Sequence, residues 1–285
     1  MSNEIVYSCP FVPGEFIAAC GMTPRRVVAA VASSRIPPGV CPYAHAFASE
    51  ATASDAAAIV VTTACDQMRR AAEVIGRSSA TPVFLMNVPH TQTPSARELY
   101  RQEIERLGTF LQMHGGSVPD LGLLAELMLS READRPSHAA TGIPVALIGG
   151  PLPASSPVID IIEKAGAYVA LDGTENGERT RPASFDLDRV RIDPIRALAD
   201  AYFAIPDPFR RPNGGFFDWL KRGIDERGVR AVILRRYVWC DTWHAEAQRI
   251  RELTDLPFLQ IDVGDEGDDP ARTLTRLQCL MEMLG

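Results

Sequence analysis

Short apolar runs alternate with longer amphipathic segments along the chain, and this alternation restricts the fold more than any other feature. An apolar run of a few residues between turn residues is typical of a buried strand, whereas apolar residues three and four apart are typical of a helix. Strands that alternate with helices form parallel sheets covered by helices on both faces. The pattern therefore predicts an α/β fold made of doubly wound, mainly parallel sheets.

The expected elements divide the chain into two similar parts. Strands are expected at residues 26–32, 57–62, 82–87, 144–148, 168–171, 229–234 and 258–262. Helices are expected at residues 15–21, 43–55, 66–75, 95–114, 121–131, 156–166, 192–203, 216–227, 243–254 and 270–284. A linker-like stretch at 135–142 interrupts the pattern, and 285 residues suffice for two domains. We expect an N-terminal α/β domain at 1–134 and a C-terminal α/β domain at 135–285.

Composition and missing motifs exclude several classes of function. A net charge of −7 argues against a nucleic-acid partner, which usually requires a basic surface. The apolar runs are far shorter than the ~18 residues of a membrane span, and the N-terminus lacks the basic start of a secretory signal. We therefore expect a cytoplasmic protein without a membrane partner. The chain contains no G-x-G-x-x-G, P-loop or G-x-S-x-G motif, which leaves nucleotide-binding and hydrolase functions without support.

The candidate chemical groups are cysteines that follow expected strands. Cys41, Cys65 and Cys240 each lie between an expected strand and the next helix. Ligands of open α/β sheets bind beyond the carboxyl ends of the strands, and a helix N-terminus favours the thiolate that binds metals. By themselves the spacings leave three interpretations open: a metal site, structural burial, or one catalytic cysteine. Cys20 and Cys279 are expected to pack in the core, and Cys9 is expected to be structural.

Five stretches in sequence order resemble one family. They are residues 13–24, Cys41-Pro42-Tyr43-Ala44, Cys65 to Arg70 (CDQMRR), residues 87–100 (NVPHTQTPSARELY) and residues 239–243 (WCDTW). Together they resemble the 2-hydroxyacyl-CoA dehydratase D-component family, which includes 2-hydroxyglutaryl-CoA dehydratase and benzoyl-CoA reductase-type subunits. The chain departs from this family at Glu175, which stands where many members have a cysteine, and it is shorter than typical members.

The resemblance implies an iron–sulfur enzyme subunit. It implies that Cys41, Cys65 and Cys240 hold a 4Fe-4S cluster, or a double-cubane cluster, in the cleft between the domains, with one iron open to water or substrate. A separate ATP-hydrolysing iron–sulfur activator would supply a low-potential electron, and the acyl-CoA thioester would become a ketyl radical anion. The product would be a dehydrated acyl-CoA or a reduced ring. The expected partner is a homologous second subunit in a heterodimer, or a second copy in a homodimer.

The resemblance also suggests roles for four further residues. Arg69 and Arg70 would stabilise the charge of the cluster or bind CoA phosphate, although a solvated helix face explains them equally well. His45 and Glu15 would be catalytic; the alternatives are an ordinary surface or packed histidine and a favourable helix N-terminal charge. Two other functions remain open: an electron-transfer subunit that carries a cluster without substrate chemistry, and a metal-free α/β binding protein.

Overall fold

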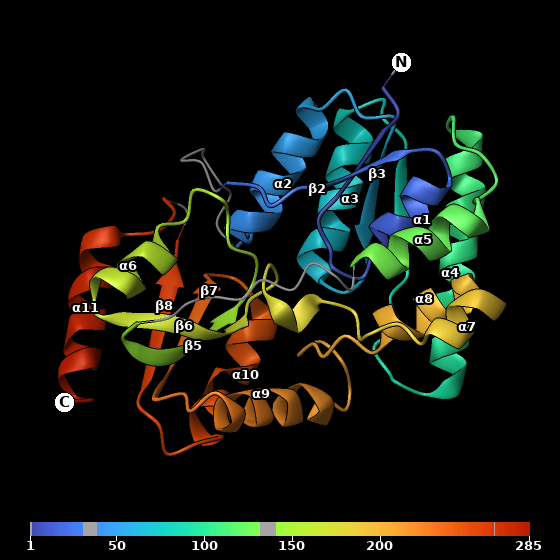
Figure 1. Ribbon diagram of the computed structural model, residues 1–285. Coiled ribbons are helices and arrows are strands. Elements are labelled where there is room, and N and C mark those ends of the chain that lie inside the picture. Colours follow the sequence, from blue (N-terminus) through green and yellow to red (C-terminus); the bar gives the residue numbers. More distant parts are fainter. Residues whose placement is uncertain (1, 31–38, 132–140, 265) are drawn as a thin grey trace.

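The computed structural model describes residues 2–30, 39–131, 141–264 and 266–285. In these residues the strands form two four-stranded sheets, and every neighbouring pair of strands is parallel (Figure 1). The strands of the first sheet are β1 (Glu4–Tyr7), β2 (Thr23–Arg26), β3 (Ala58–Thr62) and β4 (Val83–Met86). Those of the second sheet are β5 (Ile143–Gly149), β6 (Ala167–Gly173), β7 (Ala231–Tyr237) and β8 (Phe258–Val263). The predicted two-part parallel α/β architecture is confirmed.

The two sheets share one topology. Their strand orders are β2-β1-β3-β4 and β6-β5-β7-β8, so each strand of the first sheet has a counterpart at the same place in the second. The central strands are nearly continuous apolar runs, and β3 is buried over its whole length, as expected for parallel strands covered on both faces. The loops after corresponding strands therefore leave the two sheets at corresponding points.

Helices cover both faces of each sheet. The helices of the first part are α1 (Gly14–Ala19), α2 (Pro42–Ala53), α3 (Asp66–Ser78), α4 (Pro94–Met113) and α5 (Leu121–Arg131). Those of the second part are α6 (Val158–Lys164), α7 (Leu187–Ile192), α8 (Pro194–Phe203), α9 (Gly214–Glu226), α10 (Asp241–Glu252) and α11 (Pro270–Glu282), with a 3₁₀ turn at Glu178–Thr180. One apolar core joins α2, α3, α6 and α11 to both sheets, so the two parts share buried surface.

The second part of the chain also contributes to the core of the first. Helices α7 and α8 pack against α4 and α5, away from the second sheet (Figure 1). Leu198, Tyr202 and Phe203 are buried in the same cluster as Ile5 and Leu107. The expected boundary between residues 134 and 135 lies outside the described residues, and so does most of the expected linker at 135–142.

Two expectations about the first sheet are wrong. The central strand β1 was not expected, because four residues are too few to show a periodic pattern. The strand expected at 26–32 is Thr23–Arg26 instead, and residues 31 and 32 lie outside the described residues. The reason is the end of β1: its last residue, Tyr7, pairs with Arg26, and the ladder closes with the Val27 amide, which donates to the Tyr7 carbonyl oxygen at 2.7 Å. Helix α7 was also not expected.

Within the described residues, no helix combines the length and the apolar character that crossing a bilayer requires.

Candidate functional site

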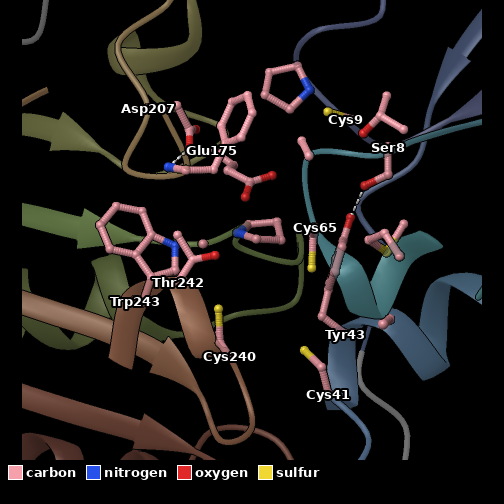
Figure 2. A pocket seen from close by; sticks show the side chains of 18 of the residues that line it. Ser8, Cys9, Cys41, Tyr43, Cys65, Glu175, Asp207, Cys240, Thr242 and Trp243 are labelled. Carbon is pink, nitrogen blue, oxygen red and sulfur yellow. Dashed lines mark hydrogen bonds between the residues drawn. The ribbon is translucent and has the colours of Figure 1, made fainter. Parts of the chain in front are cut away.

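The loops at the carboxyl ends of the two sheets enclose one cleft. It has about 770 Å³ of space, including its open mouth. Residues that follow β1, β3, β6 and β7 line it, and so do residues from the start of α2 and from the loop after α8 (Figure 2). Ligands of open α/β sheets bind at this edge. Here two such edges contribute to a single site.

Cys41, Cys65 and Cys240 lie together in this cleft, as expected from their places in the sequence. Each is the N-cap residue of a helix, Cys41 of α2, Cys65 of α3 and Cys240 of α10. Figure 2 shows the three side chains directing their sulfur atoms toward the same space. Three helix N-termini, each with partial positive charge, therefore converge on three sulfurs.

Burial raises the pKa of all three thiols. The pKa of Cys65 rises from 9.0 to about 11, and the pKa values of Cys41 and Cys240 also lie above 9.0. The amides of the first helical turns act in the opposite direction, although none of the three side chains makes a cap hydrogen bond. These raised pKa values favour neutral thiols at pH 7, and a bound cation would convert them to thiolates with release of protons.

Two carboxyl groups from the second part of the chain face the same cleft. Glu175 follows β6, and Asp207 lies in the loop after α8. Asp207 accepts a 2.5 Å hydrogen bond from the buried guanidinium of Arg179, which also donates to the carbonyl oxygens of Gly173 (2.8 Å) and Pro206 (3.1 Å). Burial raises the pKa of Glu175, the Arg179 charge lowers it, and the Asp207 charge raises it. Arg179 thus neutralises Asp207, whereas Glu175 forms no ion pair with another residue in the described part of the chain.

The rest of the lining is mostly apolar. Tyr43 from α2 and Tyr237 from β7 meet with ring centroids 5.7 Å apart, which connects the two parts of the molecule beside the sulfurs. The Tyr43 hydroxyl forms a hydrogen bond with the Ser8 hydroxyl, and the Tyr237 hydroxyl donates to the carbonyl oxygen of Pro151 at 3.1 Å. These two rings give the cleft an apolar surface beside the sulfurs.

The other predicted site residues lie elsewhere. Glu15 lines a separate pocket with Arg26 and Thr180, where the Tyr202 hydroxyl donates to its carboxylate at 2.5 Å. His45, in the first turns of α2, is half-buried and is not among the residues that line the cleft. The catalytic roles of Glu15 and His45 stay predictions that the shape of the cleft does not favour.

Arg69 and Arg70 lie on the outer face of α3. Arg69 forms an ion pair with Asp66 at 2.8 Å, and Arg70 forms one with Glu73 at 3.2 Å. Arg70 is 62% exposed, and neither arginine lines the cleft. The solvated helix face that we considered for these two residues agrees with this placement, and their cofactor role stays a prediction.

Sequence reasoning missed several residues of the cleft. Cys9 and Glu175 follow β1 and β6, so the post-strand position that singled out the other cysteines applies to them as well. Recognition of β1 as a strand would have included Cys9. Cys20 is buried as expected. The expectation for Cys279 is wrong, because α11 turns its neighbours Leu277 and Leu280 inward and leaves Cys279 exposed.

The cysteines of the cleft are donors of the kind that iron–sulfur groups use. No three His, Cys, Asp or Glu side chains in the described part of the chain form a group that could hold a metal ion. A cubane cluster is larger than one ion, so its thiolates stand farther apart around it. Three cysteines from three loops, all directed into one partly dry cleft, fit such a cluster in chemistry, because thiolates are the usual ligands of iron–sulfur clusters.

The comparisons with known proteins agree with the resemblance seen in the sequence. The family model described as 2-hydroxyglutaryl-CoA dehydratase, D-component, matches residues 2–135 and again residues 121–284. The chain belongs to this family. A D-component is one part of a dehydratase, which implies a partner subunit. The two matches cover the two sheets in turn, as expected if each part of this D-component chain carries the same strand order. No curated protein matches the chain.

Proposed function

We propose that the chain is the iron–sulfur subunit of a 2-hydroxyacyl-CoA dehydratase or a benzoyl-CoA reductase-type enzyme. The observation that carries this proposal is the convergence of Cys41, Cys65 and Cys240 on one cleft from three helix N-termini. These three residues would hold a 4Fe-4S cluster or a double-cubane cluster. Such a group supplies low-potential one-electron chemistry, here on an acyl-CoA thioester. A homologous subunit and a separate ATP-dependent iron–sulfur activator would be the partners.

The protein's own residues prepare the cleft for this role. Helix N-termini favour negative charge, so the first turns of α2, α3 and α10 would stabilise the thiolates and the net charge of a bound cluster. The rings of Phe11, Phe209 and Trp243 line the same cleft and would exclude water from the reacting groups. The Arg179 guanidinium holds Asp207 and the main chain at Gly173, which fixes the wall that carries Glu175.

Metal analysis with matched cysteine variants tests this proposal. Protein purified without oxygen should contain about four iron and about four sulfide per chain for one cluster, or correspondingly more for a double cubane. Cys65→Ser should lose most of this iron and the EPR signal of the reduced protein, whereas Cys279→Ser, on the exposed face of α11, should keep both. Wild-type protein that stays free of iron after reconstitution, or a Cys65→Ser variant that loads normally, would refute the proposal.

A second function, electron transfer without substrate chemistry, has one observation in its favour. The described residues that line the cleft include two carboxyl groups and no Lys, Arg or His, so this cleft offers no cation to the phosphates of CoA. Titration of the loaded chain with an acyl-CoA, alone and with its partner subunit, separates the two functions. Binding by the isolated chain supports the catalytic subunit, and binding by the complex alone supports the electron-transfer subunit.

A further inference from the structure

The repeated topology places cleft residues in corresponding pairs. Cys65 and Cys240 are one pair: each lies three residues beyond the third strand of its sheet, which ends at Thr62 or Tyr237. Each is the N-cap of the helix that follows, and each precedes an aspartate. The two loops therefore repeat one local structure on opposite sides of the cleft.

Cys41 has a counterpart of a different chemical type. It follows β2, the second strand of the first sheet, and the corresponding strand of the second sheet is β6. The residue that reaches the cleft from the loop after β6 is Glu175. By strand order Glu175 therefore corresponds to Cys41, and the cleft receives three Cys, Asp or Glu side chains from each part of the molecule.

The Glu175 side chain lies in the same cleft as the three sulfurs. Figure 2 shows its carboxyl group facing the same space as the Cys41, Cys65 and Cys240 side chains. Glu175 lines the cleft together with Cys41, Cys65 and Cys240. Cys9 and Asp207 also line the cleft, and Asp207 is already paired with Arg179.

Both parts of the molecule hold the main chain of Glu175. Arg26, at the end of β2, donates to its carbonyl oxygen at 2.7 Å, and the Thr180 hydroxyl donates to the same oxygen at 2.9 Å. The Glu175 amide donates to the carbonyl oxygen of Gly150 at 3.4 Å. A residue fixed on both its amide and its carbonyl side projects its carboxyl group from a defined point on the wall.

We propose that Glu175 is the fourth donor of the cluster site, an oxygen ligand that completes the set formed by Cys41, Cys65 and Cys240. The inference rests on the proposed function, because it requires the cluster. On binding, the carboxyl group gives its proton to solvent and one oxygen bonds to iron, with no change in oxidation state. A carboxylate oxygen is a harder ligand than a thiolate and binds this kind of iron less strongly. Glu175 is therefore expected to exchange with added ligands more readily than a fourth cysteine would.

Spectroscopy of the loaded full chain tests this ligand without an activity assay. Wild type, Glu175→Ala, Glu175→Cys and the control Glu178→Gln are reconstituted with ⁵⁷Fe and sulfide without oxygen. Glu178 belongs to the same loop but forms an ion pair with Arg227 at 2.5 Å and does not line the cleft. Mössbauer spectra should show one iron with an oxygen ligand in wild type and Glu178→Gln, and four similar thiolate-bound irons in Glu175→Cys.

Added 2-mercaptoethanol gives a second measurement. The thiol should shift the EPR signal of reduced Glu175→Ala at a concentration at least tenfold lower than it needs for wild type, and it should leave Glu175→Cys unchanged. Equal Mössbauer spectra and equal thiol titrations for wild type and Glu175→Ala would overturn the inference and leave the proposed function intact. Wild type that assembles no cluster would overturn both. The Glu175→Cys variant decides the question if Glu175→Ala does not fold.

Discussion

The buried ion pair between Arg179 and Asp207 is predicted to be a main stabilising element of the cleft wall. The Arg179 side chain has no exposed surface, whereas that of Asp207 is 12% exposed, so loss of the Asp207 carboxylate would leave the Arg179 charge buried. Among the described residues, one terminal nitrogen of Arg179 has no hydrogen-bond partner. Removal of one member of a buried pair costs about 3–5 kcal/mol, because the other charge stays buried without compensation. Asp207→Asn keeps an acceptor oxygen, so we expect a loss of about 3 kcal/mol, at the lower end of that range.

Urea unfolding of the metal-free full chain, followed by circular dichroism, measures this loss. The matched control is Asp188→Asn, which removes an ion pair with Arg191 whose side chains are 89% and 75% exposed. An exposed pair of this kind contributes about 0–1 kcal/mol, so the control should unfold close to wild type. An Asp207→Asn variant that unfolds within about 1 kcal/mol of the control would refute the reasoning, because the Arg179 charge would then be compensated in some other way.

Three further predictions concern the metal-free chain. Burial raises the pKa of Cys65 from 9.0 to about 11, so above pH 9 the folded state keeps a proton that the unfolded state loses, and the free energy of unfolding falls as the pH rises. This thiol should lower the free energy of unfolding by about 1 kcal/mol between pH 8 and pH 10. Urea unfolding should therefore show a smaller fall for Cys65→Ser than for wild type. Burial also raises the pKa of Glu175, so ionisation of this group lowers the stability of the folded state once the pH exceeds the ordinary glutamate pKa of ~4.3. The thermal midpoint of Glu175→Gln should therefore rise relative to that of wild type from pH 4 to pH 7. A difference in midpoint that does not change with pH would contradict this. The buried Tyr100 hydroxyl donates to the carbonyl oxygen of Phe11 at 2.6 Å; Tyr100→Phe should lose about 1–2 kcal/mol of unfolding free energy, and no change would mean that water reaches this carbonyl.

Local pattern was enough to predict the parallel α/β class and the place of three cleft cysteines. A strand of five or more apolar residues followed by a helix is encoded in neighbouring residues, and β3 with α3 is an example. Cys65 then lies at a strand end and a helix start because of that local order alone. The same reasoning failed for β1, whose four residues form a central strand only because β2 and β3 pair with both of its edges.

The roles of the remaining cleft residues could not be predicted, because they depend on contacts between distant segments. Asp207 reaches the cleft because α7 and α8 pack on the first part of the chain, and nothing local to α8 encodes that choice. Cys279 shows that local pattern can also predict burial wrongly. An apolar neighbourhood on a helix predicted burial, but the face that α11 presents to the second sheet is set by the packing of Leu277 and Leu280.

The sequence by itself determined the repeated order of strands and helices, the helix N-terminal position of Cys41, Cys65 and Cys240, and the family to which these motifs belong. The tertiary structure alone decided that the edges of two sheets share one cleft and that Glu175 faces the three sulfurs there. The physical reason is the distance along the chain over which each interaction acts. Hydrogen bonds within a helix and side-chain alternation act over a few residues, whereas the cleft forms where buried surfaces of two separate sheets meet.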